Sequence, residues 1–82
     1  GYLVVPNPTD GQLVVRHYRD LENLRRIAVV NTAGQTVWSA SYNGNASSYI
    51  PVDIRGQAAG TYYVRLIYTN KARTTKIIKT TR

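Results

Sequence analysis

Side chains that could carry chemistry are few and widely spaced in this sequence. The acids are Asp10, Asp20, Glu22 and Asp53, and the one histidine is His17. Catalytic carboxylates must converge in pairs, but Asp10 and Asp53 each precede a turn, where aspartate caps backbone donors. A zinc site needs about three or four ligands, so we do not expect His17 to bind a metal. Because His17 lies on an alternating strand, we expect it at a half-exposed packing position. The sequence indicates no metal site and no cofactor.

Nucleophilic catalysis has no better support. The absence of cysteine excludes a disulfide scaffold, a thiolate metal site and a cysteine nucleophile. The serines lack the G-x-S-x-G context and a reliable base, and no phosphate loop or dinucleotide fingerprint occurs. We therefore predict that the protein is not an enzyme.

Positive charge is concentrated in the second half of the chain. The formal charge is +7, and Asp53 is the only acid after residue 41. The last twelve residues contain no acid and carry Lys71, Arg73, Lys76, Lys79 and Arg82. Such a basic end favours an anionic partner, namely nucleic acid, lipid head groups, lipopolysaccharide or an acidic protein groove. The alternative is a solvated edge strand whose lysines prevent edge-to-edge association.

The elements that must position these residues are short strands. The 82 residues include nine Val, six Ile, nine Thr and seven Tyr, and Phe and Met are absent. This balance favours an all-β domain spanning 1–82. The longest apolar runs are about four residues, too short to span a membrane. Because Met is missing even at position 1, we expect the chain to be part of a longer polypeptide.

Turn signals recur about every ten residues, which predicts a sandwich or barrel of about seven antiparallel strands. Asn31-Thr32-Ala33-Gly34 predicts a turn that joins the strands on either side of it into a hairpin. Asn43-Gly44 predicts a type I′ hairpin turn between two strands, and residues 19–26 predict a polar connection. Pro51 places its strand at an edge or ends its pairing. The expected strands are Leu3–Val5, Gln12–Tyr18, Ile27–Val30, Thr36–Tyr42, Ala46–Val52, Gly60–Tyr68 and Arg73–Lys79.

Alternation along these strands predicts which side chains face inward. The expected inward residues are Leu13, Val15, Ile27, Val29, Val37, Ile50, Val52, Tyr62, Val64 and Leu66. Trp38 and Tyr62 are interpreted as packing residues. The remaining tyrosines leave open a cell-surface adhesion or carbohydrate-binding β-sandwich module as the alternative function. Without an RNP motif or a zinc knuckle, we predict no nucleic-acid partner.

Three stretches together resemble a known family. They are residues 5–15, beginning Val-Pro-Asn-Pro-Thr-Asp-Gly, residues 30–37, Val-Asn-Thr-Ala-Gly-Gln-Thr-Val, and Gly60-Thr61-Tyr62-Tyr63-Val64 with the closing Lys76-Ile77-Ile78-Lys79. In order and spacing they are similar to the C-terminal sorting domain, type A, of proteins exported by the type IX secretion system of Bacteroidota. The resemblance runs from Leu3 to Lys79.

The resemblance implies a seven-stranded immunoglobulin-like sandwich at the end of a larger secreted protein. Such a domain is a secretion signal that passes through the periplasm with its cargo and is recognised by the type IX machinery. A surface sortase commonly removes it while the cargo is attached to anionic lipopolysaccharide at the cell surface.

Recurrent elements of the family correspond here to particular residues. They are Pro6, Asn7, Pro8, Gly60, Tyr62, Lys76, Lys79 and, in a slightly longer tail, Arg82. Each of these motif residues could instead have a purely structural role in the fold. We expect the last strand, packed beside Gly60–Tyr68, to present Lys76, Lys79 and Arg82 to an acidic surface of the export machinery.

Overall fold

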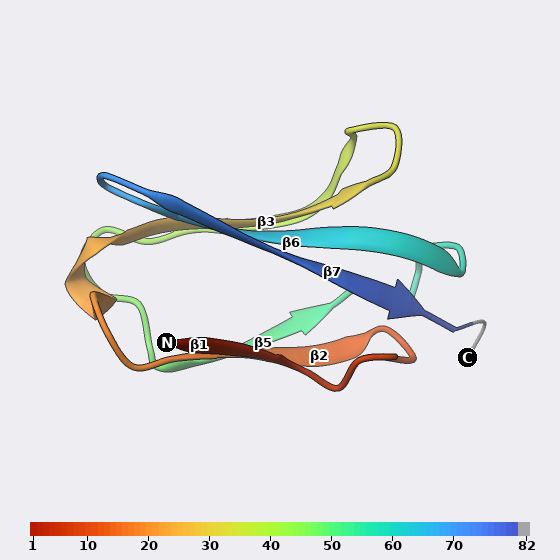
Figure 1. The fold of residues 1–82 in the computed structure, drawn as a ribbon, viewed down its shortest axis with the longest axis horizontal. Helices are drawn as coiled ribbons and strands as arrows, with labels where there is room; N and C mark the ends of the chain where they lie inside the picture. The colour runs from red at the N-terminus through yellow and green to blue at the C-terminus, as the bar shows by residue number, and fades with distance from the viewer. Residues whose placement is uncertain (81–82) are drawn as a thin grey trace.

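Two β-sheets packed face to face make up the structure, a computed structural model in which residues 1–80 are described (Figure 1). The first sheet has the order β1-β2-β5, formed by Tyr2–Val5, Gln12–His17 and Tyr49–Asp53. The second has the order β4-β3-β6-β7, formed by Thr36–Ser41, Leu24–Asn31, Gly60–Tyr68 and Ala72–Lys79. All pairs of neighbouring strands are antiparallel. The predicted all-β, immunoglobulin-like sandwich of seven strands is confirmed.

The core lies between the sheets because alternate residues of each strand face inward. Along β6, Tyr62, Val64, Leu66 and Tyr68 are buried, and along β2 Leu13, Val15 and His17 are buried. The predicted inward residues are all buried except Val37, which is half-buried. Val37 lies on β4, an edge strand with a neighbour on one side only, so its side chain is less completely covered.

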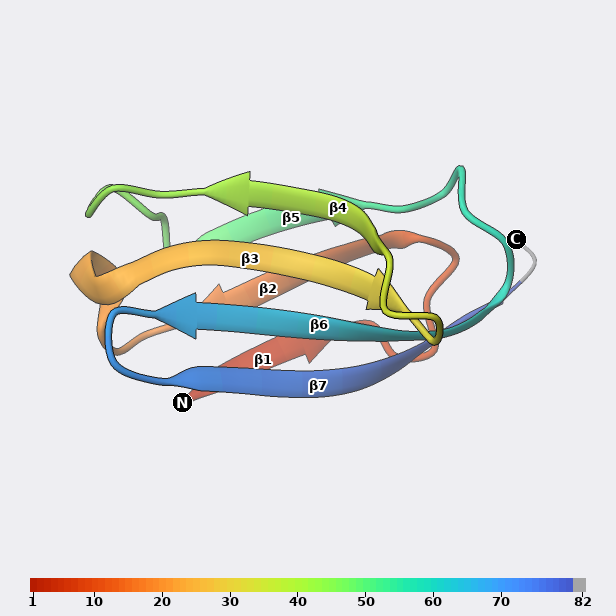
Figure 2. The same cartoon turned by 90° about the horizontal axis from the view of Figure 1, so that it is seen from above.

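The two predicted hairpins that flank this core are present. Strand β3 pairs with β4, and β6 pairs with β7. Pro51 lies on β5, an edge strand of the three-stranded sheet, where its missing donor removes no bond of an inner strand. Figure 2 shows the four-stranded layer lying across the three-stranded one.

The predicted hairpin at Asn43-Gly44 is wrong. Strand β4 belongs to the four-stranded sheet and β5 to the other, so the chain crosses between the sheets after Ser41. Gly44 does have a positive φ of 78°, but β5 begins only at Tyr49 and pairs with β2. In that register Ile50 lies opposite Val15 on the core face, and this long-range burial decides the pairing over the local turn.

Two further expectations need correction. Residues 21–23 form a 3₁₀ turn, but Leu24 already starts β3 and is fully buried, so the stretch is not merely a polar connection. His17 is fully buried instead of half-exposed, because it continues the inward face of Leu13 and Val15. No helix in residues 1–80 is long and apolar enough to cross a membrane.

Strand β7 is an edge strand of the four-stranded sheet and extends along the long axis of the molecule (Figures 1 and 2). Figures 1 and 2 both show β1 beginning at one end of the long axis and β7 finishing at the other. The molecule measures about 35 × 22 × 18 Å along its principal axes. The motif residues must therefore be placed relative to the two ends of β7.

Candidate recognition site at the end of strand β7

The exposed edge of β7 is covered by the Pro-Asn-Pro segment. The Asn7 amide Nδ2 donates to the backbone oxygen of Lys76 at 3.1 Å, and its Oδ1 accepts from the backbone N–H of Ile78 at 3.0 Å. One side-chain amide thus satisfies a donor and an acceptor that a neighbouring strand would otherwise pair. The peptide bonds Val5–Pro6 and Asn7–Pro8 are both cis. Asn7 therefore terminates the sheet at this edge.

Thr9 continues this pairing toward the end of the chain. Its backbone N–H donates to Ile78 O at 2.9 Å, its carbonyl accepts from Thr80 N at 2.9 Å, and it forms an isolated parallel bridge with Lys79. The buried hydroxyl of Thr9 accepts from Gly11 N at 3.0 Å and donates to Gln12 O at 2.9 Å. The first and last motifs of the sequence are therefore joined directly.

Gly11 sets how closely this loop approaches the rest of the molecule. Its φ is +118°, and a Cβ there would lie 2.6 Å from the Cα of Arg55. The Gly11 carbonyl accepts from Ile54 N at 2.8 Å. Only glycine fits at this close approach to Arg55.

Arg55 also pairs with Asp53. Its hydrogen bonds and positive charge, with Nη2 at 2.8 Å from Asp53 Oδ2, lower the pKa of Asp53 to about 2.

Gly60 and Tyr62 support β7 from the opposite flank. Gly60 opens β6 with a φ of +149° and pairs with Lys79, and Tyr62 pairs with Ile77. The Tyr62 ring is buried, and its hydroxyl donates to the carbonyl of Ala58 at 2.5 Å. A tyrosine near the start of this strand, bonded back to the backbone a few residues upstream, is a hallmark of immunoglobulin-like sandwiches. Tyr62 is thus a packing residue.

Of the three cations expected at this end, Lys76 and Lys79 lie on opposite faces of β7. Lys76 is exposed, whereas Lys79 is 4% exposed and donates from Nζ to Thr80 O at 3.2 Å. Residues three apart on a strand face opposite sides of the sheet, so the expected presentation of Lys79 is wrong. Arg82 lies outside the described residues. On the outward face Lys76 lies beside Ile78, which is 39% exposed.

The residues that could carry catalysis or bind a metal do not lie close together in residues 1–80. In residues 1–80, no group of His, Cys, Asp and Glu could hold a metal ion. His17 uses Nε2 to donate to Ser47 O at 2.9 Å, while its buried Nδ1 has no partner within residues 1–80. Because a carbonyl oxygen can only accept, Nε2 carries a proton in this hydrogen bond. His17 is therefore a packing residue joined to the loop before β5.

Sequence reasoning missed Thr9 and Gly11 as parts of this end. Both lie inside the recognised 5–15 stretch, but their partners, Ile78 and Arg55, are more than forty positions away. It also missed a second basic cluster, at the start of β7, which combines Arg73 with Arg19. Alternation within β7 would have separated Lys76 from Lys79.

The architecture and this site define an immunoglobulin-like module in which the two ends of the sequence meet on an edge strand. The family described as the secretion system C-terminal sorting domain matches residues 3–80. Because the match covers nearly the whole chain, the protein belongs to this family, a C-terminal sorting signal of the type IX secretion system. A comparison with curated proteins found no match.

Membership has direct consequences for location and partners. A type IX sorting domain implies export across the outer membrane to the cell surface or the extracellular space. It also implies interaction with the secretion machinery and a cargo N-terminal to the domain. The family indicates a sorting role and not an enzymatic one.

Proposed function

We propose that residues 1–82 form a single type A sorting domain of a larger secreted protein from a Bacteroidota species. In this proposal the domain is non-catalytic, passes through the periplasm with its cargo, and is recognised at the C-terminal end of β7. The observation that carries the proposal is the cover that Asn7 and Thr9 place over this strand. It makes one continuous surface from two motifs at opposite ends of the sequence.

The motif residues then divide into two roles. Asn7, Gly60 and Tyr62 hold β7 in place, as their hydrogen bonds and strand pairing indicate. Lys79 supports the strand from its inner face. Lys76 remains as the exposed cation of the described strand end, and with Ile78 it offers a charged and an apolar contact to an acidic groove of the machinery. Arg82 extends the positive charge along the sequence.

Later steps follow the family resemblance. A surface sortase removes the domain as the cargo is attached to anionic lipopolysaccharide, and the basic end of the chain favours an anionic surface at that stage. Nucleic acid has no place in this sequence of events, since the domain acts outside the cytoplasm.

The proposal is tested by fusing a reporter to the N-terminal side of residues 1–82 in a Bacteroidota host. The fraction of reporter accessible to added protease at the cell surface is measured. Deleting Lys76–Arg82 should abolish delivery, because it removes both the charges and the edge strand. Lys76→Glu should reduce delivery by roughly twofold or more, since one exposed charge pair contributes little but reversal is repulsive.

A matched control is Arg65→Glu, which reverses an exposed charge on the neighbouring strand β6. Delivery of this variant should equal that of the wild type. Thermal unfolding of the purified domain must show that both variants are folded. Equal delivery of the Lys76→Glu and Arg65→Glu fusions would show that the machinery does not recognise Lys76.

A further inference from the structure

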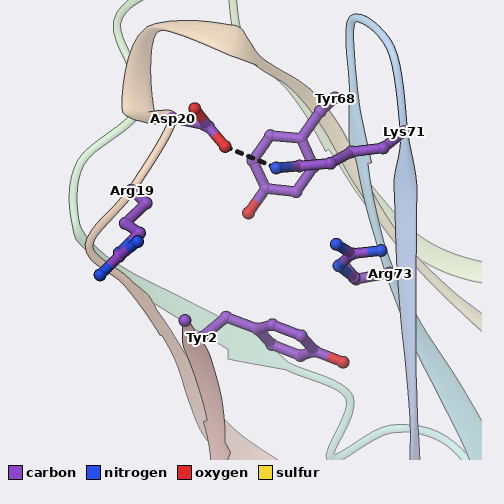
Figure 3. A pocket seen from close by; sticks show the side chains of 7 residues that line it. Tyr2, Arg19, Asp20, Tyr68, Lys71 and Arg73 are labelled. Atoms are coloured by element: carbon purple, nitrogen blue, oxygen red, sulfur yellow. Dashed lines mark hydrogen bonds and ion pairs between the residues drawn. The ribbon is translucent and has the colours of Figure 1, made fainter.

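A basic pocket lies at the end of the molecule away from the site described above. It has a volume of about 630 Å³ and lies between the start of β1 and the turn that joins β6 to β7. Figure 3 shows Arg19 and Arg73 on opposite sides of the pocket, with Asp20, Tyr68 and Lys71 between them. The side chains that matter for its chemistry are Tyr2, Arg19, Asp20, Tyr68, Lys71 and Arg73.

The inward face of β7 explains why a cation lies there. Arg73 pairs with Leu66 and shares the face of Thr75 and Ile77, the side of the strand turned toward the other sheet. Across from it stands Tyr2, whose hydroxyl accepts from Thr75 Oγ1 at 2.8 Å. The sheets end at this point, so Arg73 projects into an open gap instead of a closed core.

The pocket contains more positive charge than its one carboxylate can pair. Asp20 Oδ2 accepts from Lys71 Nζ at 2.5 Å, and this bond lowers the pKa of Asp20, which is therefore ionised. Lys71 Nζ also lies 5.2 Å from the centre of the Tyr68 ring. Within residues 1–80, Arg19 and Arg73 form no ion pair. Two guanidinium groups thus line the pocket without a carboxylate partner among these residues.

The wall that holds this charge includes a residue with a left-handed backbone. Asp20 has a φ of 58°, the one positive φ among the non-glycine residues 1–80. It precedes the 3₁₀ turn, yet its side chain makes no capping bond to that turn and instead holds Lys71. Residues kept in unfavourable backbone conformations concentrate at binding sites, where the surrounding structure enforces them.

Tyr68 supplies a neutral donor to the same space. Its ring is buried, and Figure 3 shows its hydroxyl directed into the pocket. Burial raises the pKa of this phenol, so the hydroxyl keeps its proton at neutral pH. Two arginine forks, one lysine and one phenol therefore line the pocket.

We infer that this pocket binds a carboxylate group presented by an acidic segment of a partner protein. Guanidinium forks match the two oxygens of a carboxylate and bind it through paired, charge-assisted hydrogen bonds. The choice of a protein as the source rests on the sorting function, which requires contact with the secretion machinery. The pocket is a second contact point, at the opposite end of β7 from Lys76.

The inference is tested on the isolated chain by amide chemical shifts in two-dimensional NMR. The probe is a short peptide of consecutive glutamates, and the matched control is the same peptide with glutamines. The glutamate peptide should shift the amides of residues 19–20 and 71–73 saturably, and its affinity should fall with added salt. The glutamine peptide should leave these signals unchanged.

Variants separate the pocket from general positive charge. Arg19→Ala with Arg73→Ala should weaken binding by roughly tenfold, since paired charge-assisted hydrogen bonds are lost. The double variant Arg65→Ala with Lys76→Ala removes the same charge elsewhere and should bind within about twofold of the wild type, because exposed charges outside the site contribute little. Asp20→Asn should strengthen binding, because it removes the competing carboxylate.

Three outcomes would overturn the inference. The first is that the chemical shift changes centre on β7 near Lys76. The second is that both double variants weaken peptide binding equally. The third is that inorganic phosphate binds in the pocket and the glutamate peptide does not, which would indicate a phosphoryl ligand. Thermal unfolding verifies that each variant is folded. If the double variant is not, Arg73→Lys, which keeps the charge and removes the fork, should still weaken binding. Delivery of the Lys76→Glu fusion is independent of all these results.

Discussion

The two ends of strand β7 follow the same alternation but differ in what lies opposite. Near its C-terminal end, Asn7 and Thr9 cover the edge and the inward cation, Lys79, is buried. Near its N-terminal end Tyr2 hydrogen-bonds to the strand, and the inward cation, Arg73, projects into an open pocket. A cation on the inward face of β7 therefore supports the fold at one end and is free to bind at the other.

This contrast also shows two ways to protect an edge strand from pairing with another chain. Natural sheets use covering loops and inward-pointing charges for this purpose, and the covered end of β7 uses both. The open end has a cation on its inward face and a turn that limits its length. We expect the covered end to contribute more to stability and the open end more to ligand binding.

The largest effect is expected from Gly11→Ala at the covered end. The new Cβ would lie 2.6 Å from Arg55 Cα, on a backbone with a φ of +118°. Strain and overpacking together should lower the free energy of unfolding by about 3 kcal/mol or more, a large part of what a domain of this size has. Chemical denaturation of the purified domain measures the loss.

Gly34→Ala is the matched control for this prediction. Gly34 also has a positive φ, +82°, but its Cβ would meet nothing within 4 Å. Only the backbone strain remains, about 1 kcal/mol. Equal losses in the two variants would mean that the contact between Gly11 and Arg55 does not hold the loop.

How much of this could be read from the sequence depends on the range of the interactions. The strands, their inward faces and the two hairpins follow from alternation within about ten residues, and these predictions are confirmed. Alternation also contained the correct answer for two residues. His17 continues the buried face of β2, and Lys79 lies three positions from Lys76 and hence on the other face.

The rest depended on partners that no local pattern identifies. Asn43-Gly44 is a sound turn signal, but the pairing of β5 with β2 was decided by burial across the core. The hydrogen bonds of Asn7 reach residues about seventy positions away, and Asp20 meets Lys71 across 51 positions. Charge counts located the basic half of the chain, but only the fold separates its buried, exposed and pocket-lining cations.

A smaller loss of stability is expected from His17→Ala. His17 lies against Tyr68, which lines the pocket at the open end of β7. The buried His17 ring lies edge-on to Tyr68 at 6.4 Å between centroids and donates to Ser47 O. Truncation leaves a cavity and an unpaired carbonyl, which should destabilise the domain by about 2–3 kcal/mol. Tyr18→Ala, at the exposed neighbour, should change stability by less than about 1 kcal/mol, because it removes one exposed contact with Arg16. If the two variants unfold alike, His17 is not the packing residue described here.

The comparison of the two edges is sharpened by Asn7→Ala and Tyr2→Phe. Asn7→Ala uncovers Ile78 N and Lys76 O, so we expect a loss of about 1–2 kcal/mol. Tyr2→Phe removes one hydroxyl at the open end and should cost about 0.5 kcal/mol. Hydrogen exchange of the amides of residues 76–79 gives a second measurement, and it should rise only in Asn7→Ala. Faster exchange there in Tyr2→Phe would contradict the separation of the two ends.

The smallest effect concerns the exposed carboxylates, Asp53 at the covered end and Asp20 at the open end. Hydrogen bonds from Arg55 lower the pKa of Asp53 to about 2, and those from Lys71 lower that of Asp20. A carboxylate whose folded pKa lies below its ordinary value stabilises the fold above that value and loses this contribution as the pH falls. The thermal midpoint of the wild type should therefore decline between about pH 4 and pH 2.

Asp53→Asn and Asp20→Asn should each flatten this decline slightly, because both pairs are exposed and screened. Asparagine tolerates the left-handed backbone at Asp20, so that variant tests the charge alone. Glu22→Gln, at an acid that forms no ion pair within residues 1–80, serves as the control and should leave the pH profile unchanged. At neutral pH, Asp20→Asn should lose a little stability and gain affinity for the glutamate peptide, whereas Asp53→Asn should lose stability alone. A gain in affinity in both variants would mean that the peptide responds to net charge and that the two ends of β7 do not differ in binding.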